Sequence, residues 1–143
     1  MNKEFIPYEQ SVALKELGFD EPCFRYVYIG DTGNNCHHYI EVKPSKGENF
    51  NVKPLCISQP TFSQAFRWFR EKYGLKHDID DDNVGTKFYY KIRSYTDKFD
   101  NYYDIIKPMR EERDWSKIEF YSYEEAELAC LIKLIEIVKE GKT

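Results

Sequence analysis

The chain has 143 residues, of which 41% are hydrophobic and 32% charged, with a net charge of −4. This length is typical of one domain and the composition supports a core, so we predict a single domain over residues 1–143 and exclude a disordered chain. The mild acidity argues against broad binding to a phosphate backbone, which usually requires a basic surface. Aromatic residues make up 17%, which suits half-buried sheet faces and binding surfaces alike.

The chain contains four cysteines, but an even count indicates disulfides only in a secreted protein. The first residues lack the apolar run of a signal peptide, and no stretch approaches the ~20 apolar residues of a membrane span. Cys130 falls on the apolar side of a predicted helix, where a free cysteine behaves as a small hydrophobe. We therefore expect reduced thiols, a cytoplasmic location and no membrane contact.

A first helix is predicted over residues 7–17. Pro7 fits its first turn, where the missing N–H has no cost. Gly18 stands where a left-handed residue ends a helix, and Phe19 would then contact Leu14, as in a Schellman ending. The end of this helix is therefore better defined by the sequence than its start.

A hairpin should follow, because strand-like residues near 24–29 and 37–43 flank a cluster of turn formers at 31–35. The pattern disappears over residues 44–60, which predicts a long loop with at most a short strand near 50–52. Loops of this length inside a compact domain are often functional. A closed pocket beneath this loop, with a carboxylate or histidine of perturbed pKa, would indicate a ligand site.

A second helix is predicted over residues 61–73, opened by a capping box and ended by Gly74. Trp68 points away from its apolar stripe, toward the side where Leu75 emerges, and Arg67 faces water. The stripe itself consists of Phe62, Ala65, Phe66, Phe69 and Tyr73.

A sheet region follows, with strands expected near 75–80, 87–94, 102–106 and 117–121 and a turn at 81–85. The strand at 87–94 alternates most clearly, which predicts one buried and one solvated face. Its buried face carries Phe88, Tyr90 and Ile92, and its solvated face carries Lys87, Tyr89, Lys91 and Arg93.

The last helix begins with a capping box at residues 122–125 and ends at Gly141. Its apolar side chains cover more than half the circumference, which requires cover from other helices or from a second subunit. The resulting order is α-β-β-α-β-β-β-α. Strands in runs between helices predict an α+β fold, in which helices pack on one face of an antiparallel sheet.

Three groups of residues suggest chemistry, and each has a simpler explanation. Cys36, His37 and His38 are zinc-ligand types, but neighbouring histidines on a strand point to opposite faces and no C-x-x-C completes a site. The acidic run 78–83 lacks the glycine and the glutamate of a calcium loop, so we expect an acidic hairpin tip. His77 has no nucleophile fixed beside it by the sequence. We expect no metal, no cofactor and no catalytic residue.

The solvated face of the strand at 87–94 interleaves tyrosine with basic residues. Such a face can stack nucleobases and hold phosphates. A solvated sheet face, whose lysines prevent edge pairing, explains the same residues more simply. Nucleic-acid binding through Lys87, Tyr89, Lys91 and Arg93 is therefore kept as an alternative function.

The order of elements over residues 61–140 resembles a double-stranded-RNA-binding domain, and YEEAELA at 123–129 looks like the start of that family's last helix. In that family this helix presents lysines to phosphates, whereas Glu124, Glu125 and Glu127 occupy that neighbourhood here. Carboxylates would repel a phosphate backbone, so the resemblance implies topology without RNA binding.

A second resemblance rests on FIPYEQSVALKELGFDEPC at 5–23, QAFRWFREKY at 64–73 and YEEAELACLIKLIEIV at 123–138. These segments look like parts of small uncharacterised proteins encoded by phages and mobile elements of gut bacteria. The resemblance implies a phage-type accessory protein in the bacterial cytoplasm, and it brings no functional residues with it.

We therefore expect a non-catalytic protein that contacts another protein, with a homodimer left open. Tryptophan, tyrosine and arginine most often anchor interfaces, which directs attention to Arg67, Trp68, Leu75 and Tyr89. Two other functions stay open: nucleic-acid binding, and a small enzyme or ligand-binding protein with a pocket under residues 44–60.

Overall fold

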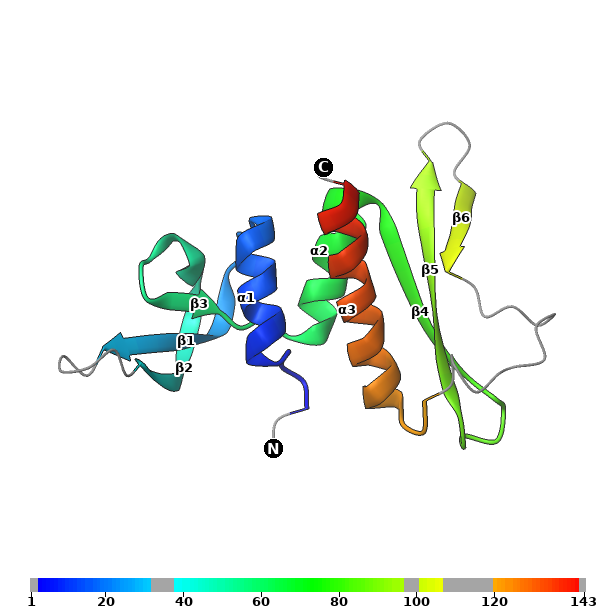
Figure 1. Ribbon diagram of the computed structural model, residues 1–143, viewed down its shortest axis with the longest axis horizontal. Helices are drawn as coiled ribbons and strands as arrows, with labels where there is room; N and C mark the ends of the chain where they lie inside the picture. The colour runs from blue at the N-terminus through cyan, green and yellow to red at the C-terminus, as the bar shows by residue number, and fades with distance from the viewer. Residues whose placement is uncertain (1–2, 32–37, 97–100, 107–119, 142–143) are drawn as a thin grey trace. The chain divides into compact units, whose positions relative to one another are not determined.

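The structure is a computed structural model that describes residues 3–31, 38–96, 101–106 and 120–141 (Figure 1). Its contacts group the chain into two compact units, Met1–Phe62 and Ser63–Thr143, which are described in turn. The predicted α+β class with antiparallel strands is confirmed. The strands form two three-stranded sheets, one in each unit, where a single sheet was expected. A single domain over residues 1–143 stays a prediction.

The first unit combines one helix with three antiparallel strands. These are α1 (Tyr8–Leu17), β1 (Cys23–Asp31), β2 (His38–Glu48) and β3 (Cys56–Ser58), with a short 3-10 helix η1 (Phe50–Val52) before β3. The sheet order is β2-β1-β3, so β1 is the central strand and β2 and β3 are edges.

The end of α1 confirms the Schellman prediction. Gly18 adopts a φ of 93°, and the N–H of Phe19 donates to the carbonyl of Leu14 at 3.0 Å. The N–H of Gly18 itself donates to Lys15 at 3.0 Å, so the last carbonyls of the helix are satisfied. Pro7 immediately precedes the helix instead of lying in its first turn.

The prediction of a long loop over residues 44–60 is wrong in three places, the first being 50–52, where the short 3-10 helix η1 replaces the expected short strand. Strand β2 continues through Pro44 to Glu48, and Cys56–Ser58 forms β3. Proline is tolerated in β2 because it is an edge strand, where a missing N–H removes no internal ladder bond. Strand β3 is hidden from pattern analysis because it has three residues that are all buried, which leaves no alternation.

The two faces of the first sheet are covered differently. Val27 and Ile57 lie opposite each other, and both are buried on the face that α1 covers. Tyr26 lies opposite Ser58 on the other face, because successive strand residues point to opposite sides. On that face the ring of Phe50, from η1, stacks on Tyr26.

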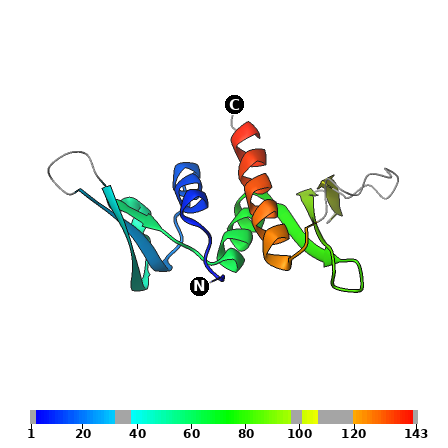
Figure 2. The same cartoon turned by 60° about the horizontal axis from the view of Figure 1, so that its bottom comes forward.

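The second unit contains α2 (Phe62–Tyr73), β4 (Leu75–Asp81), β5 (Phe88–Thr96), β6 (Asn101–Ile106) and α3 (Tyr123–Gly141). Its sheet order is β4-β5-β6, again antiparallel, with β5 central. Helices α2 and α3 lie on the same side of this sheet (Figures 1 and 2), and α3 packs on β4 and β5.

Several predictions for the second unit are confirmed. Of the predicted buried face of β5, Ile92 has no exposed surface, whereas Phe88 and Tyr90 are half-buried, as are Tyr89, Lys91 and Arg93 on the other face. Phe88 and Phe120 exchange two backbone hydrogen bonds of 2.7 and 2.8 Å, so the predicted strand near 117–121 pairs at this point, and residues 117–119 lie outside the described ranges. The hydroxyl of Ser122 accepts the N–H of Glu125 at 3.2 Å, which is one half of the predicted capping box. The Glu125 carboxylate accepts the N–H of Tyr121 at 3.2 Å, one residue before the predicted partner Ser122.

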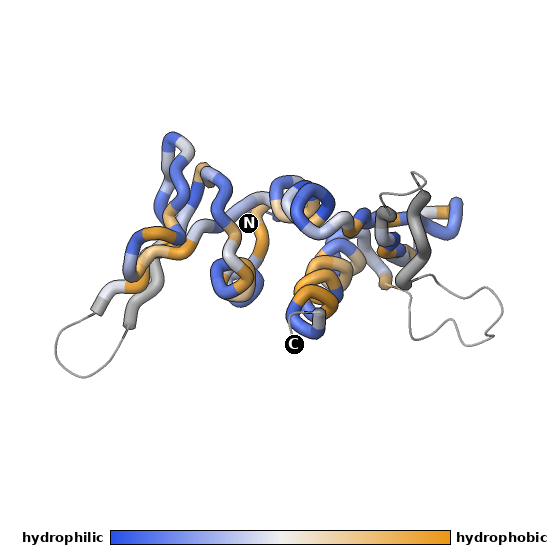
Figure 3. The backbone as a smooth tube through the Cα atoms, turned by 90° about the horizontal axis from the view of Figure 1, so that it is seen from above, coloured by the Kyte–Doolittle hydropathy of each residue, from blue (hydrophilic) through white to orange (hydrophobic). Residues whose placement is uncertain are grey.

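The wide apolar arc of α3 is covered in the folded chain. Figure 3 colours this helix hydrophobic over much of its length. Its buried residues are Ala126, Cys130, Leu131, Leu134, Ile135 and Val138. Leu128 and Ile137, at the margins of the arc, are half-buried, and Ile132, which lies outside it, is 38% exposed, so the arc is covered except at its margins. Among the described helices, none has the length and apolar character needed to cross a membrane.

Candidate functional site

The outward face of β5 carries the predicted basic residues, but carboxylates from β4 lie among them. The ammonium of Lys91 is 3.1 Å from a carboxylate oxygen of Asp80. The guanidinium of Arg93 pairs with Asp78. In both pairs the base contacts a carboxylate diagonally across β4 and β5, not the residue directly opposite. Tyr89 lies opposite Asp80 and is half-buried. Opposite charges therefore alternate on this face, and Lys91 and Arg93 already have anionic partners.

The other predicted binding residues do not share one surface. Arg67 on α2 and Lys87, which precedes β5, are exposed. Trp68 is only 3% exposed and Leu75 only 6%, so both belong to the core of the chain. A buried side chain cannot anchor a partner without local opening, so Trp68 and Leu75 are poor candidates for a docking surface.

Trp68 is buried among aromatic neighbours of its own helix. Its ring meets those of Phe69 and Tyr73 edge-on, with centroids 5.1 and 5.4 Å away. The ammonium of Lys72 lies 4.9 Å from the centre of the Trp68 ring, which allows a cation–π contact at the solvent side. The residue therefore widens the buried stripe of α2 and does not form a separate face.

His77 and Cys130 are the titratable groups most affected by burial. The imidazole of His77 lies flat on the ring of Phe66, with centroids 3.7 Å apart. Burial lowers the pKa of His77 to about 4, so the ring is neutral at pH 7. Burial also raises the pKa of the Cys130 thiol, which keeps it protonated. Both groups behave as packing residues.

The metal predictions are tested only in part. Within residues 3–31, 38–96, 101–106 and 120–141, no group of three potential ligands is placed to hold a metal ion. Cys36 and His37 lie outside those ranges. The three described cysteines, Cys23, Cys56 and Cys130, are buried free thiols.

The acidic run at 78–83 forms the predicted hairpin tip only at its end, because residues 78–81 belong to β4 and Asp82 and Asn83 lie in the turn. A carboxylate oxygen of Asp82 accepts the N–H groups of Val84 at 3.2 Å and Thr86 at 3.1 Å. The hydrogen bond from the Thr86 hydroxyl is the main reason that the pKa of Asp82 falls to about 2. This carboxylate is occupied in closing the β4–β5 turn.

Sequence reasoning missed two grooves, both in the first unit. The first, called the Leu55 groove, has a volume of about 500 Å³ between α1 and the sheet. Leu55 has a φ of 65°, so its backbone is strained, and its side chain is 48% exposed to solvent. The lining residues are Val12, Lys15, Glu16, Ile29, Leu55, Cys56 and Ile57.

The lip of the Leu55 groove is fixed by hydrogen bonds. The carbonyl of Leu55 accepts the N–H of Ile29 at 2.8 Å, which ties the residue to β1. The ammonium of Lys15 donates to the carbonyl of Cys56 at 2.7 Å. The lysine head is thus held against the backbone while its stem covers apolar surface, which keeps the walls largely hydrophobic.

The second, called the bulge groove, has a volume of about 550 Å³ and is open to solvent. It lies beside an irregularity of β2, where residues 45–47 face the single residue Phe24 of β1. Gly47 adopts a φ of 105° there, and its N–H donates to the hydroxyl of Ser45 at 3.1 Å. The lining residues are Tyr26, Pro44, Ser45, Lys46, Glu48, Phe50 and Lys53.

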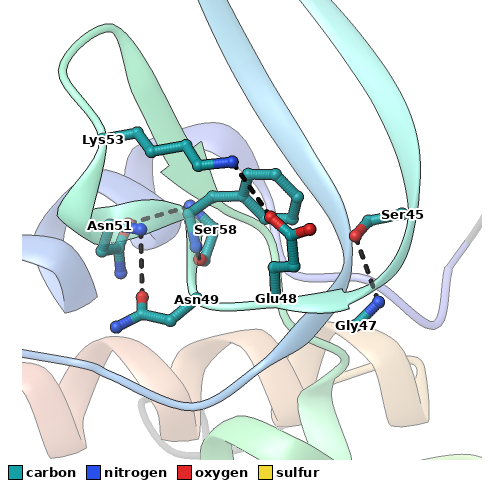
Figure 4. A network of polar contacts seen from close by, with 8 residues as sticks. Ser45, Gly47, Glu48, Asn49, Asn51, Lys53 and Ser58 are labelled. Carbon is teal, nitrogen blue, oxygen red and sulfur yellow. Dashed lines mark hydrogen bonds and ion pairs between the residues drawn. The ribbon is translucent and has the colours of Figure 1, made fainter.

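A polar network holds η1 in place beside the bulge groove (Figure 4). The amide of Asn51 donates to the carbonyl of Phe19 and accepts the N–H of Ser58, both at 2.9 Å. The hydroxyl of Ser58 accepts the N–H of Phe50 at 2.9 Å, and Asn49 accepts the N–H of Asn51 at 3.0 Å. Phe50 is therefore positioned by side chains of η1 and β3, with the backbone carbonyl of Phe19 as a third anchor.

The bulge groove lies in the segment where a ligand pocket was expected, but it differs from the expectation. It is open, and its perturbed group is Lys53, whose pKa is raised by its hydrogen bond to Glu48 and by that carboxylate's charge. The turn formers Ser45, Gly47 and Asn49 were the signal that could have located the irregularity.

Comparison with family models, with curated proteins and with solved structures finds no match to this chain. The resemblances to small phage proteins and to double-stranded-RNA-binding domains therefore stay predictions. Function has to be inferred from the geometry of the described residues.

Proposed function

We propose that this chain is a non-catalytic binding protein that recognises another protein through the Leu55 groove. The main support is Leu55 itself, which combines a φ of 65° with a side chain that is 48% exposed. A non-glycine residue at positive φ costs of order 1 kcal/mol or more, and such strain clusters at ligand clamps. The hydrogen bond from Ile29 to the Leu55 carbonyl holds this backbone conformation in the free chain. The exposure of the side chain does not benefit the free chain, and it is explained if a partner covers the side chain.

The chemistry of the Leu55 groove suits an apolar anchor. Val12, Ile29 and Ile57 supply its walls from a helix and two strands, so the groove is shaped by rigid elements. Burying one leucine, isoleucine or phenylalanine side chain there would contribute about 1.5–3 kcal/mol. A few such anchors carry most of the affinity at protein interfaces.

Nucleic-acid binding through the β5 face is the alternative function. Its basis is the Lys87, Tyr89, Lys91 and Arg93 pattern. A phosphate arriving at Lys91 or Arg93 would compete with Asp80 or Asp78, and its own charge would be repelled by those carboxylates. This competition makes the protein-binding proposal the better supported of the two.

The biological setting of the proposal comes from the sequence resemblance to phage and mobile-element proteins. We place the chain as an accessory factor of that kind, acting in the bacterial cytoplasm by contact with a protein. A second copy of the chain is one candidate partner, which light scattering over a concentration series would detect as a rise in mass.

The proposal is tested by selecting peptides from a displayed library on the wild-type chain and measuring their affinities for variants. Leu55→Gly removes the side chain and also relieves the strain, because glycine accepts positive φ. We expect selected peptides to bind this variant about tenfold more weakly or worse, through loss of one anchor. Val52→Ala changes an apolar residue that is 75% exposed and outside the groove, and should leave affinity unchanged. Peptides that bind Leu55→Gly as well as wild type would refute the proposed site.

A further inference from the structure

The turn that carries Leu55 has an unusual residue at its third position. Residues 53–56 form a type II turn, with Pro54 second and Leu55 third, and the N–H of Cys56 donates to the carbonyl of Lys53 at 3.4 Å. The third residue of such a turn needs a positive φ, which glycine and asparagine accept and leucine disfavours. The turn's own hydrogen bond is longer than the usual ~2.7–3.2 Å, so the turn depends on contacts from outside it.

Two contacts from outside the turn hold its backbone. The N–H of Ile29 donates to the carbonyl of Leu55 at 2.8 Å, which fixes that carbonyl to β1. The ammonium of Lys15, on α1, donates to the carbonyl of Cys56 at 2.7 Å and to the carbonyl of Lys53 at 3.5 Å. The first and last carbonyls of the turn thus share one ammonium.

Lys15 also joins the two walls of the Leu55 groove. Its own helix supplies one wall through Val12, and the strand after the turn supplies the other through Ile57. The side chain of Lys15 crosses from α1 to the turn, so its ammonium fixes how far the turn stands from the helix. A charged donor forms the stronger class of hydrogen bond, so this contact constrains the turn more than the turn's own 3.4 Å bond does.

We infer that Lys15 is the positioning residue of the Leu55 groove, and that it holds the 53–56 turn in the conformation that presents Leu55 to a partner. The inference rests on the proposed function, because it assigns Lys15 a role in binding at that site. Without the ammonium, rotation of the peptide between Pro54 and Leu55 converts the turn to type I, in which Leu55 has a negative φ. The relaxed turn is then favoured at least about fivefold, and affinity falls by about that factor because only the remaining fraction can bind.

The first test is made on the free chain by NMR. In a type II turn the Hα of Pro54 lies close to the N–H of Leu55 and gives a strong nuclear Overhauser effect, whereas in a type I turn the effect is weak. We expect a strong effect in the wild-type chain and a weak one in Lys15→Met, which keeps an unbranched apolar side chain but has no ammonium. Lys46→Met, at an exposed lysine that does not line the Leu55 groove, is the matched control and should keep the strong effect. An equally strong effect in Lys15→Met would overturn the inference.

The second test is a double-mutant cycle on the affinity for peptides selected on the wild-type chain. Lys15→Met should weaken binding about fivefold, and Lys46→Met should leave it unchanged. In the Leu55→Gly background, Lys15→Met should change affinity by less than about twofold, because glycine accepts positive φ and the anchor is absent. An equal loss in both backgrounds would mean that Lys15 has only a general structural role, and no loss in either would mean that it does not position Leu55.

Circular dichroism checks that Lys15→Met is folded. If it is not, Lys15→Gln, whose uncharged amide is one bond shorter than the ammonium arm, takes its place in both tests with the same expected results. Failure of the proposed function would appear as wild-type affinity in Leu55→Gly alone. Failure of this inference would appear as an unchanged nuclear Overhauser effect in the Lys15 variant, which is measured without any peptide, so the two failures are distinguishable.

Discussion

The two units of this chain contain similar secondary structure but expose different surfaces. Each has a three-stranded antiparallel sheet with a central strand and a helix packed on it. On the outward face of the second unit's sheet, the charges of Lys91 and Arg93 are neutralised by ion pairs with Asp80 and Asp78. In the first unit, a bulge and a strained Leu55 leave two grooves. The second sheet also has a register shift, between Ile92 and Arg93, so irregular backbone alone does not distinguish the units. The comparison teaches that the described outward face of the second sheet pairs its charges, whereas the first sheet is flanked by concave surface.

The largest expected effect on stability concerns Trp68, whose burial assigns it to the core and not to a docking surface. Trp68→Ala should reduce the free energy of unfolding by about 3–5 kcal/mol, the usual cost of truncating a buried tryptophan. Urea denaturation followed by circular dichroism measures it. A loss below about 0.5 kcal/mol, as expected for an exposed residue, would return Trp68 to the list of interface candidates.

The next effect concerns the network that shapes the first unit. Asn51→Ala leaves the carbonyl of Phe19 and the N–H of Ser58 without their bonds, and should cost about 2–3 kcal/mol. Asn49→Ala removes only the hydrogen bond to the Asn51 N–H and should cost about 1 kcal/mol. Chemical denaturation of both variants gives the comparison. Equal losses would mean that Asn51 does not hold η1.

The pH dependence of stability tests the packing of His77 in the second unit. The pKa of His77 is about 4 in the folded chain against 6.5 ordinarily, so the unfolded chain binds the proton first and stability falls as pH drops from 6.5 to 4. Allowing for partial exposure, we expect a loss of about 2 kcal/mol over that range. His77→Phe keeps a ring against Phe66 and removes this contribution. Identical pH profiles for the two proteins would contradict the assigned burial.

The smallest effect concerns the charge pairs on the β5 face. Asp78→Asn should cost about 1 kcal/mol at low salt and less at high salt, because the pair with Arg93 is partly exposed. Asp81→Asn, at an exposed residue outside both ion pairs, should change stability by less than about 0.5 kcal/mol. If Asp78→Asn also creates salt-sensitive oligonucleotide binding, the β5 face can bind nucleic acid once one carboxylate is removed. The two units would then differ less in their capacity to bind a partner than the account proposes.

Sequence patterns predicted those elements whose signals are local. The helix end at Gly18 and Phe19, the Ser122–Glu125 hydrogen bond and the strand containing Ile92 each depend on neighbours a few residues away, and the structure has all three. Capping, chain reversal and strand periodicity are set mainly by such local preferences.

The candidate sites could not be predicted because they depend on features with weak local signals. The φ of Leu55 is imposed by its contacts, since leucine has no preference for that conformation. The bulge at 45–47 depends on how β2 is registered against β1, and the burial of Trp68 depends on tertiary packing. The seven predicted binding residues all came from the second unit, where the sequence alternation of the predicted strand at 87–94 is easiest to recognise.

The most direct test of the central claim is a titration of the isotope-labelled full chain, followed by amide NMR, with a peptide selected on the wild-type protein. Recognition by the first unit predicts chemical-shift changes concentrated at residues 12–16 and 55–57, with residues 87–93 unaffected. Changes concentrated at 87–93 would contradict the account, because they would assign recognition to the charge-paired face of the second unit.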